Sequence, residues 1–226
     1  GVSSAASDVY KRQVPIDSKA LVQPAVEAVR KGIPVINIDI QLDAQLLEQA
    51  GVEVAFVGPD NFAAAYEVGK LLGKKLRNED KVAIIEGLAA ADNAQQRKRG
   101  FIKAIEEKGL RLVASEPADW ETEKAAEVFQ AMWMRYPDLK AVYCSNDAMA
   151  LGVLQQMQEK KCYLPVVGFD NDAVMKEFLS TGKLVATADI FSSQMAVRGI
   201  EFALDVLEGR IENRGVHSTA YEIIKQ

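Results

Sequence analysis

Short apolar runs alternate along this chain with longer segments whose apolar residues recur at helical spacing. IPVINI at 33–38, VAIIEG at 82–87 and LPVVGF at 164–169 are nearly continuous apolar runs rich in β-branched residues. A strand that is apolar on both faces is covered on both faces, so helices must lie on each side of its sheet. The alternation therefore predicts an α/β fold with mainly parallel sheets flanked by helices.

The pattern gives a regular order of elements from Asp17 to the end of the chain. Helices are predicted at 17–31, 61–76, 93–108, 121–135, 147–159, 173–180 and 193–207. Strands are predicted at 33–38, 54–58, 82–87, 111–117, 140–145, 164–169, 184–189 and 221–224. Gly32 and Gly109 follow two of the helical segments, where a helix end favours glycine.

The first 13 residues differ from the rest of the chain. They read GVSSAASDVYKRQ and show no apolar periodicity. They also lack the charged segment and the apolar segment of a signal peptide. SSAASDVYKRQ resembles translated sequencing-adapter DNA, so we interpret residues 1–13 as a non-native or disordered leader and exclude them from the fold.

Composition excludes several classes of function. The net charge is −5 and the Lys and Arg residues are scattered, which argues against a nucleic-acid partner. No run of 18 apolar residues occurs, so we expect no stable membrane insertion. Cys144 and Cys162 are too few for a disulfide framework and are expected to be small core residues. The single histidine, His217, is expected at the surface, and we predict no metal site and no cofactor.

Polar side chains stand where four of the predicted strands end. Asp39, Asn146, Asp170 and Asp189 each close or directly follow a strand. In open α/β sheets, ligands bind beyond the carboxyl ends of the strands. An Asp or Asn at any one of these positions could instead cap a helix. Their recurrence at four strand ends favours a ligand site over capping alone.

Arg97 and Trp120 add a guanidinium and an indole to this set, from segments that follow two other strands. A sugar hydroxyl both donates and accepts hydrogen bonds, so carboxylates, an amide and a guanidinium suit it. The apolar face of a sugar ring suits an aromatic plate, which Trp120 can provide. Trp133 lies at core spacing within a helix and is expected to be a packing residue.

Seven segments together resemble the ribose-binding-protein family of periplasmic proteins. They are PIDSKALVQPAVEAVRKGIPVINID (15–39), FVGPDN (56–61), RKRGF (97–101), PADW (117–120), YCSNDAMALG (143–152), VVGFD (166–170) and IKQ (224–226). They occur in the family's order and span nearly all of residues 14–226. The resemblance implies a type I periplasmic-binding-protein fold, in which two α/β lobes joined by three crossings close on one sugar.

The resemblance also implies roles for the site residues. Asp39 would accept from ring hydroxyls and Arg97 would donate to the ring. Trp120 would stack on the sugar, at a position where ribose binders have Phe. Asn146 and Asp170 would bridge hydroxyls.

Two positions depart from the family's pattern. Ile40 replaces the arginine that usually follows the first Asp. Ile190 replaces a glutamine near the later crossing, with Asp189 beside it as a weaker candidate. Both changes remove a polar contact, so the resemblance does not identify ribose as the ligand.

The resemblance places the crossings near Pro59–Asp60, Ile190–Phe191 and Thr219–Ala220. The first lobe would comprise residues 14–59 and 191–219, and the second 60–190 and 220–226. The match begins inside the family's third βα unit. The opening strand–helix–strand–helix–strand, roughly 60 residues at about 30 per unit, would therefore be missing and the first lobe incomplete.

We predict the substrate-binding component of an ABC-type sugar importer. It would bind a pentose or hexose, deliver it to an ABC permease, and lie in the periplasm or be lipid-anchored outside a Gram-positive cell. One alternative is the effector domain of a lactose-repressor-type regulator, which shares fold and sugar chemistry. A glycoside-cleaving enzyme with paired carboxylates is a second alternative. The absence of GxSxG, P-loop and GxGxxG motifs favours a protein that is not an enzyme.

Overall fold

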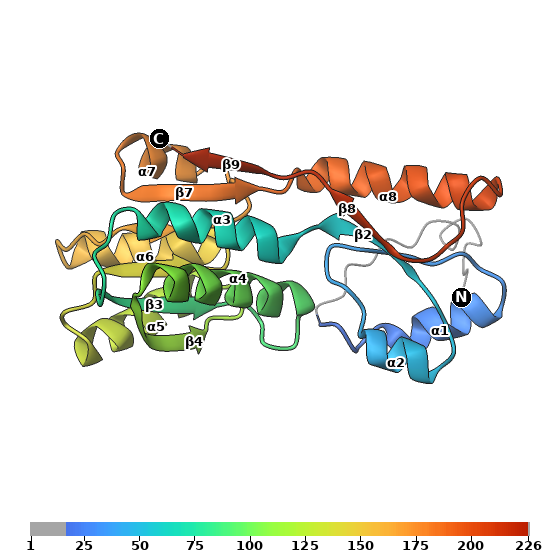
Figure 1. Cartoon of the computed structure of the whole chain (residues 1–226), viewed down its shortest axis with the longest axis horizontal. Helices are drawn as coiled ribbons and strands as arrows, with labels where there is room; N and C mark the ends of the chain where they lie inside the picture. The colour runs from blue at the N-terminus through green and yellow to red at the C-terminus, as the bar shows by residue number, and fades with distance from the viewer. Residues whose placement is uncertain (1–16, 226) are drawn as a thin grey trace, which may run out of the picture.

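The computed structural model describes residues 17–225, so the predicted leader at 1–13 and residues 14–16 lie outside the described part. Within that part the chain forms two sheets, arranged one after the other along the long axis of the molecule (Figure 1). The first sheet has the order β1 (Ile36–Ile38), β2 (Ala55–Pro59), β8 (Val216–Thr219). Its strands are parallel.

The second sheet is larger and has six strands. Their order is β4 (Arg111–Pro117), β3 (Lys81–Glu86), β5 (Ala141–Cys144), β6 (Val166–Val167), β7 (Leu184–Asp189), β9 (Glu222–Lys225). All of its pairs are parallel except β7 with β9. The predicted α/β fold with mainly parallel sheets is confirmed.

Helices flank both sheets. The helices beside the first sheet are α1 (Val22–Arg30), α2 (Ala44–Gln49) and α8 (Ser192–Leu207). Those around the second sheet are α3 (Asn61–Gly73), α4 (Asp92–Lys108), α5 (Thr122–Arg135), α6 (Asp147–Glu159) and α7 (Met175–Ser180). In the described residues no helix is long and apolar enough to cross a membrane.

Three local features differ from the sequence-based prediction. The short helix α2 and the strand β8 were not predicted, and α1 begins at Val22 instead of 17. β8 reads VHST and three of its four residues are exposed, so it has no apolar run to reveal it. Before α1, the Asp17 carboxylate accepts hydrogen bonds from the N–H groups of Lys19 and Ala20, which holds this segment in a turn.

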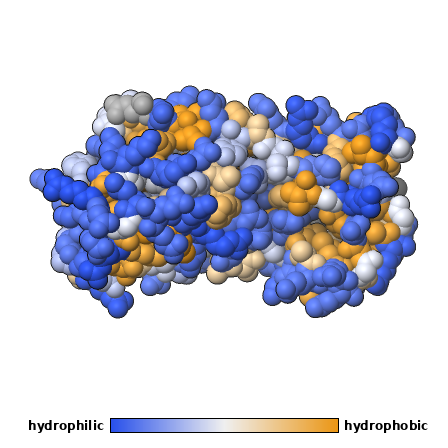
Figure 2. All heavy atoms as spheres, in the orientation of Figure 1, coloured by the Kyte–Doolittle hydropathy of each residue, from blue (hydrophilic) through white to orange (hydrophobic). Residues whose placement is uncertain are grey.

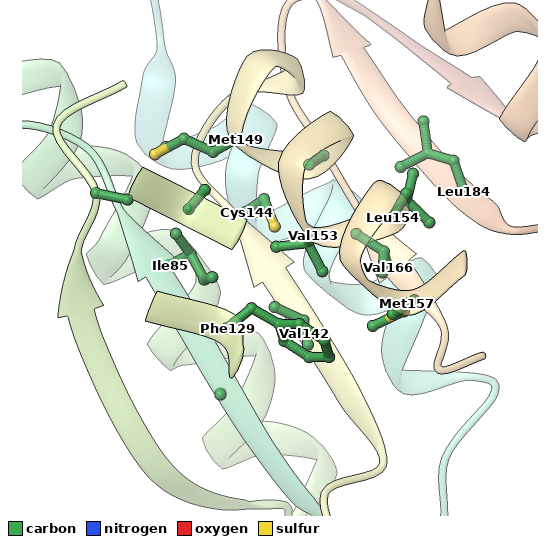
Figure 3. Packing of buried hydrophobic residues seen from close by; sticks show 14 of the residues in the cluster. Ile85, Phe129, Val142, Cys144, Met149, Val153, Leu154, Met157, Val166 and Leu184 are labelled. Carbon is green, nitrogen blue, oxygen red and sulfur yellow. The ribbon is translucent and has the colours of Figure 1, made fainter. Parts of the chain in front are cut away.

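Each face of the second sheet is covered by a separate apolar core. On one face, Phe129 of α5 and Val153 of α6 pack against Ile85 and Val142 (Figure 3). On the other, α3 and α4 pack against the sheet around Phe101 and other fully buried residues. Cys144 is buried in the first of these cores, Cys162 is half-buried, and both thiols are free.

The chain passes between the two sheets at three places. β2 ends at Pro59 and leads into α3, β7 ends at Asp189 and leads into α8, and β8 ends at Thr219 and leads into β9. These connections lie side by side in the middle of the molecule (Figure 1). They place the strand ends of the second sheet opposite residues that follow β1.

The surface of the first-sheet half carries apolar side chains. Orange atoms gather there in Figure 2. α8 contributes Val197, Ile200, Leu204 and Leu207, each more than two fifths exposed. Its buried face, with Phe202, packs on Ala55 and Val57 of β2.

Candidate functional site

A cavity of about 340 Å³ opens at the carboxyl ends of the second-sheet strands. Residues from both halves of the molecule line it: Asp39, Ile40, Asn93, Arg97, Trp120, Asn146, Asp170, Asp172, Ile190 and Ser192. The lining combines three carboxylates, two amides, a guanidinium and a hydroxyl with one indole and two aliphatic side chains. Such a mixture of hydrogen-bonding groups and apolar surface suits a small polyol with an apolar face.

The structure brings five of the six predicted site residues to this cavity: Asp39, Arg97, Trp120, Asn146 and Asp170. Asp189 does not line it. One Asp189 carboxylate oxygen accepts from Asn171 Nδ2 at 2.9 Å, and the other accepts from the Phe191 N–H at 2.7 Å. Asp189 therefore fixes the turn from β7 into α8, where Phe191 has a left-handed backbone (φ 48°).

Arg97 is the centre of the hydrogen-bond network of the site. It projects from α4, and only 3% of it is exposed. Its Nε donates to Asn61 Oδ1 at 2.9 Å, and its Nη1 donates to the Ser145 carbonyl at 2.8 Å and to Asp170 Oδ1 at 3.2 Å. The guanidinium lies 3.7 Å from the centroid of the Phe169 ring. Nη2 has no hydrogen-bond partner among the described residues, so it can donate to a ligand.

Two of the lining carboxylates take up protons more readily than an ordinary Asp. Burial raises the pKa of Asp170 to about 6, and the charges of Asp172 and Asp39 add to this, while Arg97 opposes it. Burial also raises the pKa of Asp39, again against the effect of Arg97. A ligand that donates hydroxyl hydrogens to these carboxylates would favour their ionised forms.

Trp120 lies in the cavity wall because the residue beneath it has no side chain. A Cβ added to Gly87 would come within 2.1 Å of the indole ring, so only glycine lets the ring lie in this place. Trp120 itself has a left-handed backbone conformation (φ 72°). Trp133, by contrast, stacks on Phe129 with ring centroids 5.9 Å apart in the core. The prediction that Trp133 is a packing residue is confirmed.

Asn146 has a structural bond as well as a place in the cavity. Its Oδ1 accepts from the Met149 N–H at 2.9 Å and caps α6. The same side chain therefore caps a helix and lines the cavity. Only the Nδ2 group is left to donate to a ligand.

Residues of the first-sheet half touch α4 directly beside the cavity. The Ser18 N–H donates to the Ala90 carbonyl at 3.0 Å, and the Asp92 N–H donates to Ser18 Oγ at 2.9 Å. Ile40 is buried against Ala91 and Ala94 in a small apolar cluster. These contacts join the two halves along one flank of the cavity.

Sequence reasoning missed three lining residues. Asn93 lies one helical turn before Arg97, and this i to i+4 spacing was a usable signal. Asp172 and Ser192 lie two residues beyond Asp170 and Ile190, in turns whose geometry the sequence pattern does not reveal. Ile40 and Ile190, noted only as departures from a pattern, are the aliphatic part of the wall.

A second cavity, of about 440 Å³, lies between α8 and β8. Its charged residues include Arg198 and Glu201, which pair with each other on the same helix. His217 lies here, exposed as predicted, with its ring 4.3 Å from that of Phe202. This cavity collects none of the polar strand ends, so the smaller cavity is the better candidate for a site.

Comparisons with known proteins point in the same direction. A family model described as "Periplasmic binding protein domain" matches residues 13–211. The chain is 42% identical over 215 residues to the D-ribose/D-allose-binding protein of Pseudomonas aeruginosa, covering 93% of this chain and 67% of that protein. It is 35% identical to the D-allose-binding periplasmic protein of Escherichia coli K12, covering 84% of this chain and 63% of that protein.

A solved structure is similar along almost the whole chain. It is an ABC transporter solute binding protein from Burkholderia multivorans, 39% identical with a TM-score of 0.90. The alignment covers 94% of this chain and 76% of that one. The chain thus spans about two thirds of the length of the two curated relatives, and three quarters of this solved structure.

Proposed function

Since the chain belongs to the periplasmic binding protein family, we propose that it binds a monosaccharide as the substrate-binding component of an ABC-type sugar importer. The observation that carries the proposal is the convergence of Arg97, Asp170 and Trp120 on one cavity. The guanidinium and the carboxylate supply a donor and an acceptor for sugar hydroxyls. The indole supplies a plate for the apolar face of the ring.

The ligand is a neutral pentose or hexose in this proposal. Relatives named for D-ribose and D-allose support a sugar of this size. The lining has more carboxylates than guanidinium groups, which disfavours sugars that carry a carboxylate or phosphate. The protein holds the sugar without transforming it, as the names of the solute-binding relatives support.

Binding is coupled to closure of two lobes in the proposed mechanism. In this proposal, residues 17–59 and 191–219 belong to one lobe, and residues 60–190 and 220–225 belong to the other. The contacts of Ser18 and Ile40 with α4 are contacts that opening would break, so they belong to the closed arrangement. A sugar that touches Asp39 on one side and Arg97 on the other favours that arrangement.

The closed protein would then deliver its sugar to an ABC permease. The family and its relatives support a location in the periplasm or elsewhere outside the cytoplasmic membrane. The permease partner and this location are both inferred from the proposed function, so both inferences would be wrong if the proposed function were wrong.

A thermal-shift screen tests the proposed function. D-ribose, D-allose and further pentoses and hexoses are added at increasing concentration, with a sugar phosphate for comparison. A ligand at a hundredfold excess over Kd stabilises the native state by about 2.7 kcal/mol. For a chain of this size the melting temperature should rise by roughly 5–10 °C. If no neutral sugar raises it, the proposal is wrong.

Sugar affinity should rise with pH between 5 and 7. Asp170 has a folded-state pKa of about 6, and the ionised form is the better acceptor. At pH 5 only a small fraction of Asp170 is ionised, so binding should be about tenfold weaker than at pH 7.

The effect of pH on the folding stability of the unliganded protein has the opposite sign, because the pKa of Asp170 lies above the ordinary value of 3.8. The contribution of Asp170 to folding stability is present at low pH and is lost as pH rises through about 6.

Titration calorimetry across this pH range checks the prediction, with Asp170→Asn as the control. The asparagine side chain cannot ionise, so this variant should bind weakly and without the rise near pH 6. Asp147 also titrates here, because burial raises its pKa to about 7. Its carboxylate accepts from Thr187 and from the Asp172 N–H and does not line the cavity. A rise in affinity that persists in Asp170→Asn would assign the effect to another group.

A further inference from the structure

Asn93 stands out among the residues of the cavity. It is the second residue of α4, four positions before Arg97, and it lines the cavity beside Arg97 and Ile40. Only 6% of the residue is exposed. Neither the sequence pattern nor the family resemblance singles it out as a ligand residue.

The amide oxygen of Asn93 is buried without a partner. This Oδ1 is inaccessible to solvent and has no hydrogen bond from any residue that the structure describes. The buried asparagines elsewhere do have partners. Asn37 donates to the Ile40 carbonyl at 2.9 Å and accepts from the Leu42 N–H at 2.8 Å, and Asn61 accepts from Arg97. A buried polar group without a partner is unfavourable, so native structures seldom keep one without a role.

Helix capping does not account for this asparagine. The residue at the N-cap of α4 is Ala91, and no side chain caps the helix there. Ala91 and Ala94, which lie beside it in sequence, belong with Ile40 to a small apolar cluster.

The neighbouring wall is largely apolar, and the indole N–H of Trp120 is its one hydrogen-bonding group. Ile40 comes from the opposite half of the molecule and is buried on this flank. The indole of Trp120 packs on the same cluster. A sugar hydroxyl that reaches this flank therefore has Asn93 as the side chain that can both donate to it and accept from it, and Arg97 lies one helical turn further along α4.

We propose that Asn93 is a further specificity-determining residue of the sugar site, whose amide binds one hydroxyl, or two vicinal hydroxyls, of the monosaccharide on the α4 flank. The inference rests on the proposed function and deepens it. An amide can both donate and accept, so it suits a neutral hydroxyl. A carboxylate in its place would add charge beside Asp39 and Asp170, whose pKa values burial already raises. A site that hydrogen-bonds a hydroxyl discriminates against the analogue that lacks it.

The test combines protein variants with deoxy sugars. Of D-ribose and D-allose, the one that gives the larger thermal shift is taken as the parent sugar. Its affinity is compared with that of its monodeoxy analogues for the wild-type protein, Asn93→Ala and Asn93→Leu. The wild type should bind at least one analogue roughly tenfold to a hundredfold more weakly than the parent sugar. Both variants should bind the parent sugar more weakly than the wild type does. They should bind the parent sugar and the rejected analogue with affinities within about twofold of each other, and should still discriminate against the other analogues as the wild type does.

Gln96→Ala is the matched control. Gln96 lies on the same helix and bonds Asp92, and it does not line the cavity. This variant should keep the wild-type discrimination at every hydroxyl. The melting temperature of unliganded Asn93→Leu should stay the same or rise, because an aliphatic group replaces an amide whose oxygen is unpaired. A residue with a purely structural role would instead lower it.

A measurement on the wild-type protein keeps the inference testable if the variants fold poorly. The side-chain amide signals of Asn93 in a ¹⁵N-labelled sample should shift with the parent sugar. They should shift far less with the one deoxy analogue that the wild type rejects. The inference is wrong if Asn93→Leu binds the parent sugar as the wild type does, or if these signals do not respond. A wild-type protein that binds no sugar would instead refute the proposed function itself.

Discussion

Replacing Arg97 with methionine should weaken sugar binding by at least about a hundredfold and should also lower the stability of the unliganded protein. Arg97 donates to Asn61, to the Ser145 carbonyl and to Asp170. Removing it leaves these acceptors unpaired, and breaking a buried pair in this way costs about 3–5 kcal/mol. The family resemblance implied only that Arg97 donates to the sugar ring. The structure shows that Arg97 also holds four segments together.

The experiment measures sugar affinity by calorimetry and the melting temperature without sugar. Arg99→Met is the matched control, because Arg99 lies two residues further along α4 and is exposed. The control should resemble the wild type in both measurements. If Arg97→Met bound sugar normally and were merely less stable, Arg97 would be a structural residue only.

The Trp120→Ala substitution should weaken sugar binding by roughly tenfold to a hundredfold, and Trp120→Phe should keep most of the affinity. An alanine removes both the aromatic plate and much of the cavity wall, whereas phenylalanine keeps a smaller plate. Indole fluorescence should change when the sugar binds.

Trp133→Phe separates stacking from a general effect of closure. Trp133 stacks on Phe129 in the core, away from the cavity. Affinity in this variant should equal that of the wild type. Equal losses from both tryptophan substitutions would mean that the indoles report overall stability and that Trp120 does not stack on the ligand.

Most elements could be predicted from the sequence because helices cover both faces of the sheets. Strands such as β3 and β5 are buried on both faces, so they read as continuous apolar runs that no surface segment imitates. β8 escaped prediction because most of its residues are exposed at the edge of a sheet. α2 escaped because Leu47 is the one buried residue among its six, so no apolar period appears, whereas the equally short α7 buries Met175 and Leu179 one turn apart.

The candidate site could be predicted in part for a related reason. Residues such as Asp39 and Asp170 mark strand ends, and strand ends meet along one edge of a sheet. The individual roles of the side chains depend on contacts that the sequence does not show. The Asn146 oxygen caps α6, the Asp189 oxygens accept from Asn171 and Phe191, and the Asn93 oxygen has no partner among the described residues.

The strand order of the first sheet also affects the order in which the two sheets fold. Ala55, the first residue of β2, donates its N–H to the Asn213 side chain, 158 positions away, and the rest of β2 pairs with β8. The parallel strands of the second sheet pair with partners much nearer in the chain. Closing a long loop costs more entropy than closing a short one, and distant contacts slow folding. We therefore expect the second sheet to form early during refolding, with the β2–β8 pairing as a late step. Pulse-labelled hydrogen exchange should show the amides of β3 and β5 protected before those of β8.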